Sequence, residues 1–178
     1  MERSITANGE TYCLNHLRFM ETEATLELRG GFKKTVQITV SFENHCYTRS
    51  VTEVELAAKV YPEKELIQDG SEEHPRPRVF NEERYKLSFQ LPSLVQSLIT
   101  NKQKVYATSH HNVLSAQVVL DGNDRSPYVF FMKVSKDKEL KKLKIKVESA
   151  YPYDPNDPPF SLDKPQSFMK LLSKTWME

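Results

Sequence analysis

The stretch YVFFMKVSKDKELKKLKIKVESAY, residues 128–151, decides the fold. Residues 128–134 are apolar on both faces, which predicts a central strand of a sheet. The charged triplet at 136–138 predicts a turn, and the alternation over 143–151 predicts the last strand. Two strands joined by a short turn indicate an antiparallel β-meander.

The meander extends upstream of this stretch. Residues 104–108 and 113–120 favour strand, either as two strands or as one bent strand. Between them and the central strand, Asp121-Gly122-Asn123-Asp124 predicts a turn. The C-terminal half is therefore expected to hold a four-stranded meander.

Helices are predicted on both sides of the meander. Asn81 is suited to cap a helix over residues 82–90, and Pro92 predicts a kink or a restart. The second helix places its apolar side chains along one face: Leu91, Leu94, Val95, Leu98 and Ile99. The proline-rich residues 152–165 must be irregular, and a last helix is expected over 166–176.

The N-terminal part, residues 11–51, is predicted to be β-rich. Residues 35–42 alternate strictly and follow the turn signal Gly30-Gly31, which indicates a strand pair. Thr52 and Glu55 predict a capped helix that Pro62 stops. The expected fold class is α+β.

Three segments are expected along the chain. They are a β-rich region over 1–62, a linker or loop over 63–78 and a helix–meander unit over 79–178. The first and third of these can share one continuous core.

Composition limits the classes of protein. The 178 residues are 38% hydrophobic and 28% charged, with a net charge of +1, so no global field favours a polyanion. Two cysteines, no apolar segment at the N-terminus and no long apolar run predict a cytoplasmic protein without a membrane partner. No phosphate-binding glycine loop or HExxH motif occurs, so no cofactor and no metal are expected.

The last strand is the first candidate site. In a regular pleat Leu143, Ile145, Val147, Ser149 and Tyr151 share one face, opposite Lys142, Lys144, Lys146 and Glu148. The lysines form a stripe that can attract phosphates, or a solvated face that discourages edge pairing. His110 and His111 are candidates for acid–base chemistry, and Arg84 offers donors for phosphate, although each also suits a plain surface role.

Cys13, His16, His45 and Cys46 suggest a zinc-bearing module at first sight. Their spacing is poor, because the adjacent His45 and Cys46 would diverge on a strand. Buried thiols explain the cysteines better.

A helix, a four-stranded meander and the ending Ser149-Ala150-Tyr151-Pro152 resemble the barnase–EndoU–colicin–RelE (BECR-like) group of ribonucleases over residues 79–153. The resemblance implies a toxin-type, metal-independent endoribonuclease that cuts tRNA or mRNA through attack of the ribose 2′-hydroxyl. It implies proton transfer by His110 or His111, phosphate binding by Arg84 or Lys146, and roles for Ser149 and Tyr151. Helices of that group often carry a histidine, and residues 82–90 contain none.

The alternative is a non-catalytic interaction protein, for instance an accessory protein of a phage or plasmid. Its partners would be a protein or a nucleic acid, with Phe160, Phe168 and Trp176 as possible anchors or as residues that close the core. RNA, a protein inhibitor and a second copy of the chain are the partners to consider.

Overall fold

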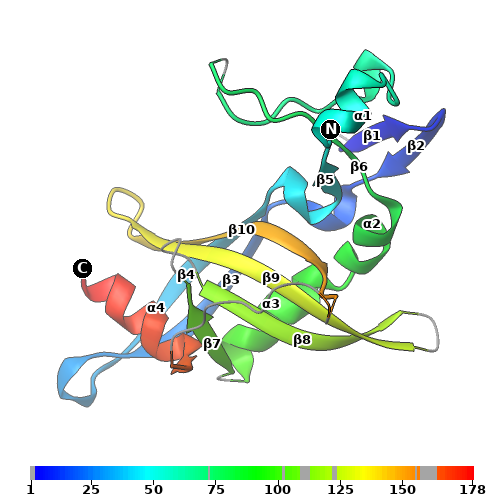
Figure 1. The fold of residues 1–178 in the computed structure, drawn as a ribbon. Helices are drawn as coiled ribbons and strands as arrows, with labels where there is room; N and C mark the ends of the chain where they lie inside the picture. The colour runs from blue at the N-terminus through cyan, green and yellow to red at the C-terminus, as the bar shows by residue number, and fades with distance from the viewer. Residues whose placement is uncertain are drawn as a thin grey trace.

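The computed structural model describes residues 3–71, 73–101, 103–108, 113–121, 124–154, 156 and 164–178. The fold is α+β and is built on a seven-stranded sheet (Figure 1). The strands, in spatial order, are β11 (Gln166–Ser167), β7 (Lys104–Ala107), β8 (Val113–Asp121), β9 (Asp124–Asp137), β10 (Lys142–Pro152), β4 (Lys33–Phe42) and β3 (Met20–Glu27).

The predicted meander is confirmed by strands β7 to β10, which pair antiparallel in chain order. β7 and β8 are separate strands with Tyr106 opposite Leu114, so the alternative of one bent strand is wrong. β9 lies between β8 and β10, in the central position that its apolar sequence predicts.

The sequence pattern did not indicate the parallel pairing of β10 with β4, in which Ile145 lies opposite Val40. β4 also forms the predicted antiparallel hairpin with β3, through a turn that contains Gly30 and Gly31, both at φ +78°. The N-terminal strand pair and the C-terminal meander are therefore parts of one sheet.

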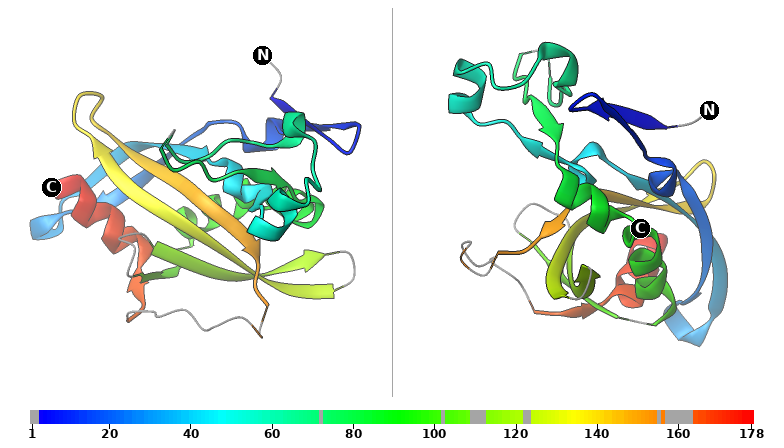
Figure 2. Two further views of the ribbon diagram at one scale, coloured as in Figure 1. Left: turned by 45° about the horizontal axis from the view of Figure 1, so that its top comes forward. Right: turned by 90° about the vertical axis from the view of Figure 1, so that its right-hand side faces the viewer.

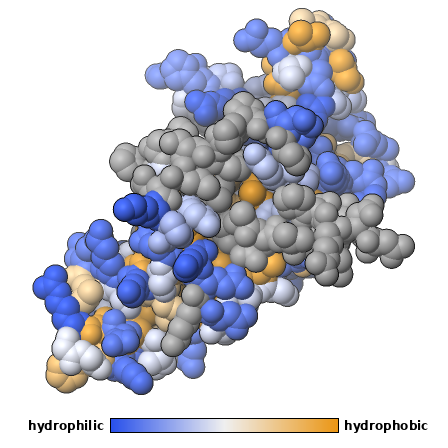
Figure 3. Space-filling view, turned by 60° about the horizontal axis from the view of Figure 1, so that its bottom comes forward, coloured by the Kyte–Doolittle hydropathy of each residue, from blue (hydrophilic) through white to orange (hydrophobic). Residues whose placement is uncertain are grey.

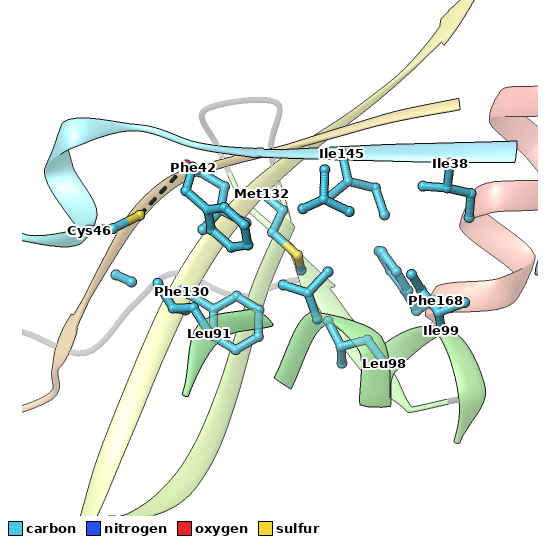
Figure 4. Packing of buried hydrophobic residues seen from close by; sticks show 14 of the residues in the cluster. Ile38, Phe42, Cys46, Leu91, Leu98, Ile99, Phe130, Met132, Ile145 and Phe168 are labelled. Atoms are coloured by element: carbon cyan, nitrogen blue, oxygen red, sulfur yellow. Dashed lines mark hydrogen bonds between the residues drawn. The ribbon is translucent and has the colours of Figure 1, made fainter. Parts of the chain in front are cut away.

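Three helices pack on the sheet and enclose its core: α2 (Glu82–Ser88), α3 (Leu91–Thr100) and α4 (Phe168–Met177) (Figures 1 and 2). Alternate residues of β4 point inward, as predicted, and Leu91, Val95, Leu98 and Ile99 of α3 are buried. Figure 4 shows Ile38 and Ile145 on one side of this core, with Leu98 and Ile99 on the other. Phe168 is fully buried in the same cluster, so it closes the core and offers a partner no anchor in this fold.

The predicted helix starts are confirmed. Thr52 and Glu55 form a capping box at α1 (Glu53–Ala57), the Asn81 side chain accepts a hydrogen bond from the Arg84 amide, and Pro92 lies in the first turn of α3. α1 ends well before Pro62, because Lys59 takes a positive φ of 49°.

Smaller elements surround one end of the sheet. They are a hairpin of β1 (Ser4–Ala7) and β2 (Glu10–Cys13), a strand pair of β5 (Thr48–Ser50) and β6 (Arg78–Phe80), and three 3₁₀ turns, η1 (Asn15–Leu17), η3 (Asn44–Cys46) and η4 (Glu63–Glu65). A further 3₁₀ turn, η2 (Arg29–Gly31), forms the β3–β4 turn at the other end. Residues 63–78, expected as a linker, contain η4 and a bridge from Ile67 to Arg78. On the surface shown in Figure 3, hydrophilic residues predominate among those that are coloured.

Candidate functional site

A cleft of about 570 Å³ lies where the end of β4, the loop after Ile67 and the strands β9 and β10 meet. Its lining is mostly polar or charged: Glu43, His45, Asp69, Arg76, Phe131, Lys146, Glu148 and Ser149. The volume falls within the range typical of sites for small ligands. Two residues predicted for a site, Lys146 and Ser149, are among its walls.

A β-bulge in β10 brings Ser149 to this cleft. The pairing of β10 with β9 runs from Val147 opposite Met132 to Ser149 opposite Phe131, so Glu148 is the extra residue. Val147 and Ala150 are buried, whereas Ser149 is half-buried. The prediction that Ser149 and Tyr151 share a face with Val147 is therefore wrong, because it assumed a regular pleat.

His45 and Asp69 form a hydrogen-bonded pair in the cleft, with 2.8 Å between His45 Nε2 and Asp69 Oδ2. Burial alone would raise the pKa of Asp69, but the hydrogen bond and charge of His45, with the charge of Arg78, lower it. An ionised carboxylate only accepts hydrogen bonds, so Nε2 carries the proton and Nδ1 is the ring atom able to take another.

The loop that carries Asp69 is fixed by its backbone. The Arg76 amide donates to the Asp69 carbonyl at 2.6 Å, and Gly70 forms a bridge with Pro75. Gly70 has φ +86°, and a Cβ on it would lie 2.5 Å from the His74 carbonyl oxygen. Only glycine fits this turn without strain, so Gly70 helps to set the position of Asp69.

The cations of the cleft differ in their partners. Lys146 Nζ lies 3.1 Å from Glu43 Oε1. Among the residues that the structure describes, the exposed side chain of Arg76 has no ion-pair partner. Farther along β10, Lys144 pairs with Asp137 at 2.6 Å, and Lys142 is opposite Asp137 in the strand register. The lysine stripe is thus partly neutralised, with Lys146 as the member that reaches the cleft.

Arg84 is held in place by the protein itself. Its Nη1 donates to the carbonyls of His45 and Thr48 at 3.2 and 2.8 Å, and its guanidinium lies 4.9 Å from the Tyr151 ring centroid. Burial lowers the pKa of Arg84, against the opposing influence of Tyr151. Arg84 therefore supports the turn that carries His45, a different position from the phosphate contact predicted for it.

Tyr151 does not line the cleft directly, but its ring stacks on Phe131, which does, with 6.0 Å between the centroids. His110 and His111, predicted to transfer protons, lie outside the described residues. Of the candidates from the sequence, the structure thus brings Lys146 and Ser149 into one cleft and places Tyr151 beside it.

Sequence reasoning missed the pairing of His45 with Asp69, which lie 24 residues apart. The polar run from Asn44 to Arg49 was the available signal for a site, and nothing in the sequence marked Asp69. Only the packing of η3 against β10 and the folded-back loop bring them together.

The four N-terminal Cys and His residues serve other contacts. Cys13 is exposed, whereas Cys46 is buried with its thiol 3.8 Å from the Val147 carbonyl oxygen (Figure 4). His16 Nε2 lies 2.7 Å from Ser88 Oγ. Within the described part of the chain, no three His, Cys, Asp or Glu side chains are grouped to hold a metal ion, so the zinc module finds no support.

Comparison with known protein families gives a match over most of the chain. The model of the YjaZ family matches residues 4–176, which is almost the entire chain. No curated protein and no solved structure matches. In the described ranges, no helix is long and apolar enough to cross a bilayer.

Proposed function

The chain belongs to the YjaZ family, and we propose that it is a metal-independent endoribonuclease whose active site is the cleft around His45. The family match itself assigns neither an activity nor a partner. The observation that carries the proposal is the His45–Asp69 pair in one cleft with Arg76, Lys146 and Ser149. The resemblance to BECR-like ribonucleases points to the same reaction.

His45 supplies the general base in this proposal. A carboxylate that accepts from Nε2 fixes the tautomer and the orientation of the imidazole, as in other histidine-based sites. Nδ1 takes the proton of a ribose 2′-hydroxyl, and the freed oxygen attacks the adjacent phosphorus. In this proposal His45 takes the role that the resemblance implied for His110 or His111.

Arg76 and Lys146 supply positive charge to the phosphate. This charge stabilises the five-coordinate transition state more than the substrate, because negative charge on the phosphate oxygens increases there. As the bond from phosphorus to the 5′-oxygen breaks, the Lys146 ammonium gives that oxygen a proton. The products are a 2′,3′-cyclic phosphate and a 5′-hydroxyl. Ser149 is suited to hydrogen-bond a phosphate oxygen, and Phe131 offers an aromatic face for a base.

The test is cleavage of total RNA and of a tRNA by the purified protein in excess EDTA, with the new ends mapped. We expect cyclic-phosphate ends, and a loss of about 100-fold or more in rate for His45→Gln, the size typical of a general base. Asp69→Asn should lose less. His74→Gln, which changes an exposed histidine in the same loop, is the matched control and should cut normally.

Two outcomes contradict the proposal. If His110→Ala with His111→Ala abolishes cutting while His45→Gln does not, the active site is elsewhere. If the folded wild-type protein cuts no RNA, the ribonuclease proposal is wrong and the interaction protein takes its place. One observation favours that alternative: Phe89 of the α2–α3 junction is 52% exposed and stacks on His16 at 3.8 Å, a surface suited to a protein partner.

A further inference from the structure

Positive charge gathers at the end of the molecule opposite α1. Three segments meet there: the β3–β4 hairpin, the β9–β10 hairpin and α4, which lie at the same end in both Figure 1 and the left view of Figure 2. Together, residues 27–34, 136–142 and 167–178 carry nine Lys or Arg and four Asp or Glu, a net charge of +5. The whole chain has +1, so the remaining residues carry −4.

Exposed apolar side chains project from the tips of the same three segments. Phe32 is 73% exposed in the β3–β4 turn, Leu140 is 64% exposed in the β9–β10 turn, and Met177 is 45% exposed at the end of α4. Each of these side chains has lysines close to it in sequence. The exposed ones include Lys33, Lys34, Lys138, Lys141 and Lys174. We call this surface the basic end.

We propose that the basic end binds the surface of an anionic lipid membrane, with Phe32, Leu140 and Met177 entering the interface. This proposal is independent of the ribonuclease. The contact is peripheral: side chains enter the headgroup region, and no helix of the described residues is long and apolar enough to cross a bilayer. The sequence predicts no membrane partner because it has no long apolar run, but a peripheral contact needs no such run.

The distribution of these side chains favours a membrane over other anionic partners. Apolar side chains at the tips of three separate elements fit a fluid lipid phase, because each can enter it independently. A lipid surface does not need a shape complementary to that of the protein. RNA offers phosphates to the lysines but no apolar phase for Leu140 or Met177. Burying apolar groups and bringing lysines near anionic headgroups both favour binding, each lysine by about fivefold.

A groove beside α4 supports the same assignment. It has a volume of about 730 Å³ and is lined by Lys33, Lys170 and Lys174 together with Leu28, Met169 and Met177. Glu27 is the one carboxylate among its lining residues. A groove lined by both lysines and apolar side chains suits a phosphate-bearing headgroup with the start of its acyl chain.

The fluorescence of Trp176 can be used to detect this contact. Trp176 is the single tryptophan, and it lies at the basic end with Lys34 Nζ and Lys136 Nζ at 4.9 and 5.1 Å from its ring centroid. If the basic end enters a membrane interface, the fluorescence of Trp176 should shift to shorter wavelength. Lipids brominated on their acyl chains should quench it.

The experiment adds the full-length protein to vesicles of phosphatidylcholine with phosphatidylserine, and to vesicles of phosphatidylcholine alone. We expect co-sedimentation and a Trp176 shift with the first, little with the second, and weaker binding as salt rises. Phe32→Ser with Leu140→Ser, and separately Lys138→Glu with Lys141→Glu, should each weaken binding about tenfold or more.

Matched controls change the same residue types away from the basic end. Phe19→Ser with Val54→Ser removes side chains that are 59% and 78% exposed, and Lys59→Glu with Lys64→Glu makes the same change in charge. Both should bind vesicles as the wild type does. The proposal is overturned if the wild type does not bind anionic vesicles, or if the controls lose as much binding as the test pairs. It is also overturned if the protein binds the single-stranded RNA polyuridylate and, in the vesicle assay, only the lysine pair and not the Phe32–Leu140 pair weakens binding.

Discussion

At the scale of single residues, Gly70 shows how a backbone requirement supports the candidate site. A side chain at Gly70 would be strained by the positive φ and would also clash with the His74 carbonyl oxygen. A side chain at Gly9 would have the first cost alone, because its φ is 79° and nothing lies within 4 Å of its Cβ position. We expect Gly9→Ala to cost about 1 kcal/mol in unfolding free energy and Gly70→Ala clearly more.

Denaturant unfolding of the two alanine variants measures this difference directly. Because Asp69 precedes Gly70, the Gly70→Ala loop should also release the His45–Asp69 contact of 2.8 Å. The His45 ring signals in NMR spectra should then change in Gly70→Ala and remain unchanged in Gly9→Ala. Equal stability of the two variants would show that the loop has another conformation.

Residue-level prediction from the sequence named two residues that line the candidate cleft. Lys146 and Ser149 were named because strand ends and basic stripes have visible patterns. Their shared location was not found, since the alternation that predicts β10 carries no sign of the bulge at Glu148. The place of Asp69 in the cleft could not be predicted either, because a single carboxylate in a charged loop has the same sequence pattern as any solvated side chain.

At the scale of elements, β3 forms one edge of the seven-stranded sheet. Its outward side chains include three exposed glutamates, Glu21, Glu23 and Glu27. An edge strand of eight residues offers unpaired backbone groups to another chain, and like charges discourage two such edges from pairing. The glutamates are therefore expected to discourage two chains from associating through this edge.

Replacing the three glutamates by threonine should remove that protection. We expect the triple variant to form oligomers as its concentration rises, whereas the wild type does not associate through this edge; light scattering after size exclusion measures the difference. Changing Glu53, Glu63 and Glu73 to threonine alters the net charge equally, away from β3, and should have no such effect. Similar behaviour of both variants would assign the effect to net charge alone.

Elements were the scale at which the sequence was most informative. Periodicity, caps and turn residues predicted β4, the meander, α2 and α3, because these signals act over a few neighbouring residues. The limit of α1 was missed, since a left-handed residue at Lys59 ends the helix without a proline. The pairing partner of β10 was missed as well, because β4 lies about a hundred residues earlier and no local signal links them.

At the scale of the whole molecule, that parallel pairing decides whether the chain contains separable units. β4 supplies Val36, Ile38, Val40 and Phe42 to the core, where they meet residues of α3, β9 and β10. Each buried side chain of this kind contributes roughly 1.5–3 kcal/mol, so β4 alone contributes roughly 6–12 kcal/mol. That range is comparable with the whole stability of a typical domain.

Residues 79–178, expressed alone, should therefore fail to fold even though they contain the complete meander. Removal of β4 exposes one edge of β10 and the apolar face of α3. We expect no cooperative thermal transition in circular dichroism for this fragment, and recovery of one when residues 1–78 are added. A cooperative transition of the fragment alone would show that the meander is a domain and that the parallel pair only joins two independent units.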